Sequence, residues 1–216
     1  MAIDTPARLA ILGAGPLGLE TALYARFLGY DIVIYERGEV ATNVRAWGGE
    51  RMDTPFRTSC TALGIAAIEA QDESFVPPAA DNLLTGREWF ERYLLPLSQT
   101  DLLADHLRLH TTVIAVGTVD TEDGDIMLTV SSRDAVGQER TENFDGVLDC
   151  TGPGNTENWQ PPEDMAQYYH ILGEKYHDLD QPFRLADGHN QIRHAFAILG
   201  DRETLDLYAG ATQLLR

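Results

Sequence analysis

Residues 8–38 read RLAILGAGPLGLETALYARFLGYDIVIYERG, and this stretch decides the fold. Its hydrophobic pattern changes twice. Residues 9–12, LAIL, form a short continuous apolar run typical of a buried strand, whereas residues 16–28 carry apolar side chains at helical spacing. Residues 31–36, DIVIYE, are rich in β-branched side chains and indicate a second strand. The stretch therefore predicts a strand, a helix and a parallel strand, which together make a βαβ unit.

A glycine motif lies between the first predicted strand and the helix. Gly13, Gly15 and Gly18 have the spacing G-x-G-x-x-G, in which the first glycine turns the chain tightly, the second lets the backbone approach a pyrophosphate, and the third packs helix on strand. Pro16 suits the first helical turn, where no backbone donor is needed. We expect a dinucleotide with its pyrophosphate at the N-terminus of this helix.

Glu36 ends the second predicted strand, where a carboxylate can accept hydrogen bonds from an adenosine ribose. The same carboxylate would repel a 2′-phosphate, which argues against NADP at this site. Because glycine-rich turns of similar spacing also occur in loops, an α/β turn without a ligand stays open as the alternative.

Length and composition limit the remaining choices. The 216 residues are 44% hydrophobic, enough for one core and a single domain. A net charge of −18 disfavours nucleic acid and anionic membrane surfaces as partners. The sequence shows no signal peptide and no apolar run of membrane-spanning length, so we expect a cytoplasmic protein. Cys60 and Cys150 form no CxxC pair and are interpreted as small buried groups.

The rest of the chain predicts an α/β fold. Residues 39–64 lack a period and indicate a long loop or short helices over the ligand site, and residues 85–107 are helical with a kink or break at Pro96. Three strands form an antiparallel β-meander, and an amphipathic helix closes the chain; these segments are 107–120, 125–132, 141–152 and 188–199. We expect a Rossmann-like parallel sheet with flanking helices and a small antiparallel β-meander, in one domain with its core at 8–155 and a linker and C-terminal helices at 156–216.

Four segments together carry a resemblance to a known family. They are residues 12–38, RAWGGERMDTPF at 45–56, LLTGREWFERYLLPL at 83–97, and VLDCTG at 147–152. The chain resembles, over about residues 8–155, the FAD-binding half of pyridine nucleotide-disulfide oxidoreductase and flavin monooxygenase-type flavoproteins. The resemblance implies noncovalent FAD, with its pyrophosphate on the glycine motif and its adenosine ribose on Glu36.

The resemblance also implies contacts beyond the motif. The segment with Trp47, Arg51 and Met52 matches a loop that passes the isoalloxazine, and Val113 lies in a strand whose backbone meets adenine. Residues 150–152, CTG, match the family's ATG turn beside the flavin. The predicted cofactor-binding residues are Gly13, Gly15, Pro16, Leu17, Gly18, Glu36, Arg37, Trp47, Arg51, Met52, Val113, Thr151 and Gly152.

The sequence departs from the family after Gly152. Family members insert a nicotinamide-binding domain there and return with a Gly-Asp pair that reaches the ribityl chain, whereas only residues 153–216 follow here. Residues 152–157, GPGNTE, repeat the glycine spacing, but the following NWQPPED cannot continue as the required helix. Gly200 and Asp201 are a Gly-Asp pair, although the helical spacing before them favours a helix end.

These observations predict an FAD-dependent oxidoreductase that acts on a small-molecule substrate and lacks its own NAD(P)H domain. Its electrons would come from the substrate, a diffusing reductant or a partner subunit, and we expect a homo-oligomer. The alternative is a noncatalytic dinucleotide-binding module or a partner subunit of a larger enzyme. His170, Glu174 and His177 could share a helix face, but one such copy favours a solvated surface segment over a metal site. The residues identify neither a catalytic group nor the substrate.

Overall fold

The computed structural model describes residues 3, 5–122, 124, 126–152, 163–176 and 183–211. The opening βαβ unit is confirmed: β1 spans Arg8–Leu12, α1 spans Pro16–Phe27, and β2 spans Asp31–Tyr35. Helix α1 begins with Gly15 as its N-cap and Pro16 in its first turn, as the sequence predicted.

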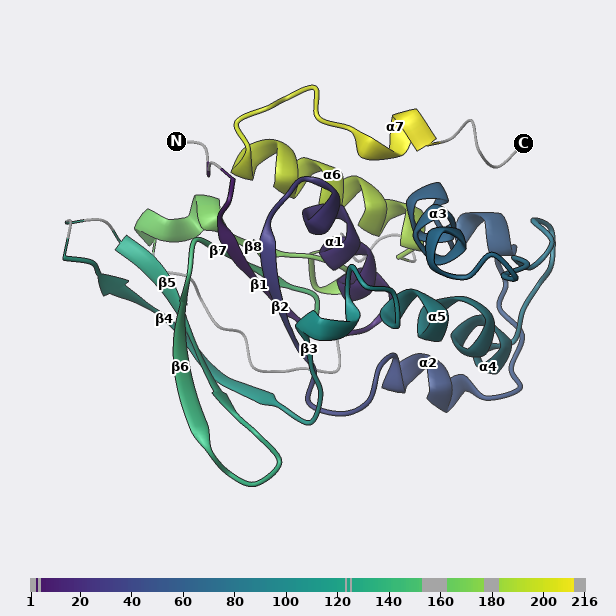
Figure 1. The fold of residues 1–216 in the computed structure, drawn as a ribbon, viewed down its shortest axis with the longest axis horizontal. Helices are drawn as coiled ribbons and strands as arrows, with labels where there is room; N and C mark the ends of the chain where they lie inside the picture. Colours follow the sequence, from purple (N-terminus) through teal and green to yellow (C-terminus); the bar gives the residue numbers. More distant parts are fainter. Residues whose placement is uncertain are drawn as a thin grey trace.

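The central sheet has five strands in the order β3-β2-β1-β7-β8, and all neighbouring pairs are parallel (Figure 1). Its other strands are β3 at Leu107–Arg108, β7 at Gly146–Asp149 and β8 at Tyr169–Ile171. Strand β1 pairs with β2 on one side and β7 on the other. Strand β8 falls in the region expected to be a linker and helices, and its three residues are too few to show a strand period.

Side chains of the central strands alternate between two layers. Leu9 and Ile11 of β1 pack in a cluster with the helices, whereas Ala10 and Leu12 pack in a cluster with the three-stranded sheet. All four side chains have no exposed area. Burial on both faces explains why this strand appears in the sequence as a continuous apolar run.

The second sheet is the antiparallel meander, in the order β4-β5-β6. Its strands are β4 at Thr112–Asp120, β5 at Ile126–Arg133 and β6 at Glu139–Phe144. The predicted first and third strands are each divided in the structure. Residues 107–108 and 146–149 pair in the parallel sheet as β3 and β7, because the chain turns at His110, with a φ of 52°, and at Asp145.

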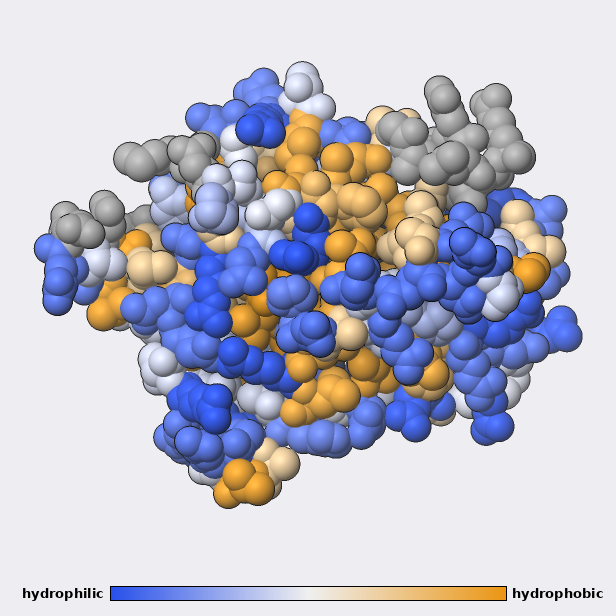
Figure 2. Space-filling model, in the orientation of Figure 1, coloured by the Kyte–Doolittle hydropathy of each residue, from blue (hydrophilic) through white to orange (hydrophobic). Residues whose placement is uncertain are grey.

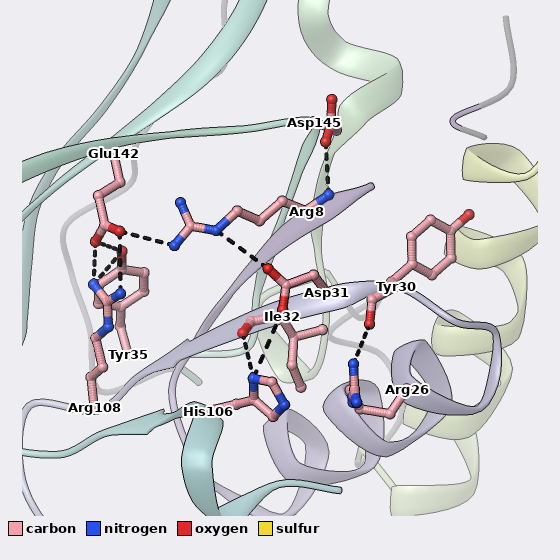
Figure 3. A network of polar contacts seen from close by, with 10 residues as sticks. All are labelled: Arg8, Arg26, Tyr30, Asp31, Ile32, Tyr35, His106, Arg108, Glu142 and Asp145. Carbon is pink, nitrogen blue, oxygen red and sulfur yellow. Dashed lines mark hydrogen bonds and ion pairs between the residues drawn. The ribbon is translucent and has the colours of Figure 1, made fainter. Parts of the chain in front are cut away.

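A polar network joins the two sheets (Figure 3). Glu142 of β6 accepts hydrogen bonds from Arg8 Nη2 at 2.9 Å and from the Tyr35 hydroxyl at 2.9 Å, and it forms an ion pair with Arg108. The Arg108 guanidinium, assisted by Arg8 and Tyr35, lowers the pKa of Glu142 to about 2. Asp145 accepts from the Arg8 backbone N–H at 2.7 Å. The network fixes the meander on the parallel sheet.

The helices flank the central sheet on the side opposite the meander (Figure 1). The longer ones are α1, α3 at Ala62–Gln71 and α6 at Leu185–Leu199. The shorter ones are α2 at Thr42–Trp47, α4 at Gly86–Trp89, α5 at Leu95–Ser98 and α7 at Leu207–Ala211. The predicted amphipathic helix at 188–199 is confirmed as part of α6, and its Phe196 stacks on Tyr24 of α1 at 5.1 Å.

The helix predicted at 85–107 is shorter than expected and contains an irregular turn. Helix α4 continues through a π-helical turn at Phe90–Leu94 into α5, which ends at Ser98. Pro96 is the second residue of α5 and follows the π turn directly, and it has no N–H to continue the helical hydrogen bonds. The helix therefore does not end at the proline: a wider π-helical turn precedes Pro96 in place of the predicted kink or break.

Hydrophilic side chains cover most of the face seen in Figure 2, with apolar residues gathered in smaller areas between them. Across the described residues, no helix is both long and apolar enough to cross a membrane.

Candidate dinucleotide-binding site

Two glycines of the motif are required by close backbone contacts. Gly13 has a φ of 98°, and a Cβ there would lie 2.9 Å from the carbonyl oxygen of Cys150. A Cβ on Gly18 would lie 1.9 Å from the carbonyl oxygen of Gly13. The first glycine therefore allows the turn and the approach to residue 150, and the third allows α1 to pack on that turn.

Gly15 differs from its two neighbours in the motif. Among the described residues, and apart from its own chain neighbours, no atom lies within 4 Å of the position that its Cβ would take. Gly15 is the N-cap of α1, and the first N–H groups of a helix have no acceptor within the helix. The space beside Gly15 thus adjoins N–H groups that have no acceptor within the helix and the positive end of the helix dipole, which suits an anionic phosphate.

Glu36 closes the glycine loop from the next strand. Its Oε2 accepts a hydrogen bond from the Ala14 N–H at 2.9 Å, and its Oε1 accepts from the Gly38 N–H at 2.8 Å. The side chain is half-buried. Because each carboxylate oxygen has two lone pairs, Glu36 can hold both loops and still accept from sugar hydroxyls.

The carboxyl ends of the parallel strands meet beside this loop. The Gly13 N–H donates to the Tyr35 carbonyl at 2.7 Å, and the Cys150 N–H donates to the Leu12 carbonyl at 2.8 Å. Thr151 and Gly152 follow β7 and are half-buried, with a φ of 71° at Gly152. The strands that follow β1 lie first on one side of it, as β2 and β3, and then on the other, as β7 and β8. The order therefore reverses at β1, and open α/β sheets bind ligands at the carboxyl end of such a switch point.

A buried polar cluster supports the turn after β7, and the sequence analysis missed it. Asp149 is 1% exposed, and its Oδ1 accepts from the Thr151 N–H at 2.9 Å and from the Thr151 hydroxyl at 2.5 Å. Lys175 donates to Thr151 Oγ1 at 2.7 Å and lies 3.4 Å from Asp149 Oδ2. An acidic residue inside the apolar run VLDC was the signal that could have indicated it.

A second buried carboxyl lies on α1, behind the glycine loop. Glu20 is 2% exposed, and its Oε1 accepts from the Thr61 hydroxyl at 2.8 Å and the Tyr93 hydroxyl at 2.9 Å. Burial raises the pKa of Glu20 to about 7, although hydrogen bonds from Thr61, Tyr93 and Tyr208 oppose the rise. This carboxyl was also missed.

The segment predicted to pass the isoalloxazine is held by α4. Trp47 is 47% exposed, and its ring stacks on that of Trp89 with the centroids 6.2 Å apart. Arg51 is exposed and forms a β-bridge with Thr85, and the Met52 N–H donates to the Leu84 carbonyl at 2.9 Å. The described contacts tie Trp47, Arg51 and Met52 to residues 84–89, so their part in a cofactor site stays a prediction.

The other predicted site residues differ in what they can offer. Val113 is 7% exposed and packs between the two sheets, and Leu17 is 8% exposed. The Leu17 side chain fills the space beside two glycines of the C-terminal region, Gly173 and Gly188. At Val113 and Leu17 the backbone is therefore the group left for a ligand, whereas Arg37 is exposed.

The Gly-Asp pair at 200–201 lies at a helix end, as its spacing favoured. Gly200 is the C-cap of α6, and Asp201 follows with a φ of 50°. A different glycine–acid pair, Gly173 and Glu174, follows β8 at the carboxyl end of the parallel sheet. The glycine-spaced segment 152–157 lies outside the described residues from 153 onward.

The cysteines and histidines carry little chemistry here. Cys60 and Cys150 are buried free thiols, and burial raises the pKa of each to about 12, in keeping with the packing role expected of them. His170 lies in β8 and Glu174 in a 3₁₀ turn, so the prediction that they share a helix face is wrong. His177 is outside the described residues. The described parts of the chain contain no cluster of three or more groups suited to a metal ion.

Comparison with known proteins supports the fold. No family model and no curated protein matches the chain. The structure is similar to S-allyl-L-cysteine S-oxygenase from Allium sativum, with a TM-score of 0.52 and 19% identity over 80% of this chain and 44% of that one. It is also similar to OTEMO in complex with FAD and NADP, with a TM-score of 0.50 and 20% identity over 73% of this chain and 28% of that one.

The chain shares the fold of these proteins. A second OTEMO structure, an FAD-bound form, gives a TM-score of 0.50 at 21% identity over 69% of this chain. The resemblance to FAD-binding flavoproteins carried by the sequence motifs is thus confirmed for the fold, as is the α/β class with its meander. The chain spans less than half the length of each of these solved structures.

Proposed function

We propose that the chain binds FAD noncovalently and serves as the flavin-binding domain of an oxidoreductase that acts on a small molecule. The observation that carries the proposal is the open space at Gly15, between two glycines that close backbone contacts require. A Cβ on residue 15 would contact none of the described residues outside its chain neighbours, so the described packing does not require a glycine there. A ligand phosphate at the N-terminus of α1 explains why a glycine is there.

The chain's own groups define how the dinucleotide would lie. The N-terminus of α1 binds the pyrophosphate, and Glu36 accepts from the adenosine ribose while it holds Ala14 and Gly38. The charge of Glu36 favours an unphosphorylated ribose, which FAD has and NADP lacks. Bound FAD would supply the electron transfer, and the protein supplies binding, orientation and electrostatics.

The far end of the cofactor would reach the ends of β7 and β8. The sequence resemblance implies a Gly-Asp pair near the ribityl chain. Gly173 and Glu174 are a Gly-Glu pair that follows β8. We therefore assign this role to Glu174 instead of Asp201, which ends α6. Both OTEMO structures were solved with FAD, which supports the same cofactor here.

A noncatalytic dinucleotide-binding module or partner subunit is the second candidate. The chain spans less than half the length of its structural neighbours, so the activity of a whole flavoenzyme is a proposal for it. The described residues form one parallel sheet with one glycine-rich βαβ unit. That electrons come from the substrate, a diffusing reductant or a partner stays a prediction. A cytoplasmic location, a homo-oligomer and a single domain stay predictions.

The absorbance spectrum of the purified chain tests the proposal. After incubation with FAD and gel filtration, the protein fraction should keep a flavin spectrum, and Gly15→Val should lose it. Gly117→Val, in the meander strand β4, is the matched control and should keep the flavin. A colourless wild-type fraction contradicts the proposal. Anaerobic bleaching by a candidate substrate would separate an enzyme from a binding module.

A further inference from the structure

Lys175 is the only lysine in the sequence. It lies in the 3₁₀ turn Glu174–Tyr176, directly after β8. Its side chain is 9% exposed, although lysine is among the residues least often buried. Because a buried ammonium needs compensation, its partners indicate why it is there.

The partners of Lys175 are the groups that shape the turn after β7. Its Nζ donates to Thr151 Oγ1 at 2.7 Å and to Asp149 Oδ2 at 3.4 Å. The Tyr169 hydroxyl lies 3.4 Å from the same Oδ2. Asp149 Oδ1 accepts both the N–H and the hydroxyl of Thr151. Thr151 is thus held from two sides, by a carboxylate and by an ammonium.

The turn at residues 150–152 packs directly against the glycine loop. Cys150, which lies between Asp149 and Thr151, has its carbonyl oxygen 2.9 Å from the position of a Cβ on Gly13. The Cys150 N–H also donates to the end of β1. A displacement of residues 150–152 would therefore displace the first turn of the motif. The compact ammonium of lysine suits such an enclosed site better than the broad guanidinium of arginine.

We propose that Lys175 is a positioning residue of the dinucleotide site: paired with Asp149, it holds the turn at residues 150–152 against the glycine loop in the conformation that binds the cofactor. This inference rests on the proposed function, because it assigns Lys175 a part in the same site. Lys175 acts through Thr151 and Asp149.

FAD titration of three variants tests the role of Lys175. Lys175→Met removes the ammonium and should raise the Kd for FAD by about 10- to 100-fold, the range of a lost hydrogen bond to a charged group. Lys175→Arg keeps the charge and should recover part of that loss. Arg133→Met removes a cation from an exposed ion pair with Glu139 in the meander and should leave the Kd unchanged.

A double variant separates positioning from folding. Lys175→Met alone leaves Asp149 buried without its cation, which can destabilise the chain. Asp149→Asn with Lys175→Met removes both charges and should recover the thermal midpoint. The FAD affinity should stay low, because Thr151 still lacks the ammonium. Recovery of wild-type affinity in the double variant would reduce Lys175 to a structural ion pair and overturn the proposal.

The single lysine also permits a direct test of the buried pair. Acetylation followed by peptide mass spectrometry should show Lys175 reacting at least 10-fold more slowly in the native protein than in urea; equal rates would contradict the ion pair. In the titration, tight FAD binding by both wild type and Lys175→Met would overturn this inference and leave the proposed function intact. Absence of FAD binding by the wild type would overturn both.

Discussion

At the residue scale, the three glycines of the motif are not interchangeable. Gly15→Val should abolish FAD binding and leave the fold intact, because no described residue other than its chain neighbours lies within 4 Å of the Cβ position. Gly18→Val should instead prevent folding, since its Cβ would lie 1.9 Å from the Gly13 carbonyl oxygen. Circular dichroism and FAD titration of the two variants check this contrast. Equal loss of fold in both would mean that Gly15 is a structural glycine.

Glu36 is expected to bind the adenosine ribose, and it also accepts hydrogen bonds from the backbone of Ala14 and Gly38. A substitution would affect both roles. Glu36→Ala should weaken FAD binding by about 1.5–3 kcal/mol, the value of hydrogen bonds to a charged group. It should also lower the thermal midpoint, because Ala14 and Gly38 lose their acceptor. Glu39→Ala is the control, since Glu39 lies in the same loop and is exposed. An unchanged FAD affinity in Glu36→Ala would exclude Glu36 from the site.

At the scale of elements, Glu20 links α1 to the N-terminus of α3 and to the π-helical turn. Thr61 is the N-cap of α3, and Tyr93 belongs to the turn. A Cβ on Gly64 would lie 2.0 Å from the Tyr93 hydroxyl oxygen, so α3 can pack against the Tyr93 side chain only with a glycine at this position. The π turn thus places a tyrosine hydroxyl where the buried carboxyl requires a donor.

The raised pKa of Glu20 predicts a pH dependence of stability. The folded protein holds the proton up to a pH of about 7, whereas the unfolded chain releases it near 4.5. The stability from the neutral form is complete below pH 4.5 and is lost as the pH rises through 7. Glu20→Gln keeps an acceptor and cannot ionise, so at pH 8 it should gain up to about 3 kcal/mol over wild type.

Urea unfolding at pH 5 and pH 8 measures this difference. The gain of Glu20→Gln over wild type should be larger at pH 8 than at pH 5. Glu69→Gln, on α3, is the control for removal of a carboxylate from the same group of helices, because Glu69 is exposed. An equal gain at both pH values would show that Glu20 ionises normally in the folded protein.

Some of the helices and strands could be predicted from the sequence, and others could not. Residues 8–38 predicted β1, α1, β2 and their order, because strand and helix periods are local properties. Strand β8 could not be predicted, since residues 169–171 become a strand only by pairing with β7. The split of the meander at Asp145 was missed although Asp145 and Gly146 form a dipeptide typical of turns. The sequence indicated the glycine loop and Glu36, whereas Asp149 with Lys175 required tertiary structure.

At the scale of the whole molecule, three layers leave one edge for a ligand. The helices and the meander cover the two faces of the parallel sheet, and its carboxyl edge holds the glycine loop, Glu36 and residues 150–152 (Figure 1). Because open α/β sheets bind ligands at such an edge, we expect the cofactor there. The described residues from 163 onward supply β8 to the parallel sheet and α6 to the helical layer. They contain no second glycine-rich βαβ unit.

This architecture predicts slow reduction by NADPH. Hydride transfer needs the nicotinamide held at near-attack distance, and such positioning supplies much of the rate. Loaded with FAD and mixed anaerobically with NADPH in a stopped-flow instrument, the chain should bleach slowly and without saturation. Wild type loaded with FAD and mixed with dithionite is the control for a reducible flavin. Rapid, saturable bleaching by NADPH would reveal a nicotinamide site that the described residues do not show.

The central claim is that the edge built from Gly15 and Glu36 binds FAD. Isothermal titration of the purified chain with FAD, and with NAD and NADP in parallel, tests it most directly. We predict saturable binding of FAD, loss of that binding in Gly15→Val, and no tight binding of NADP because Glu36 repels its 2′-phosphate. Binding of NAD or NADP with no binding of FAD would contradict the account.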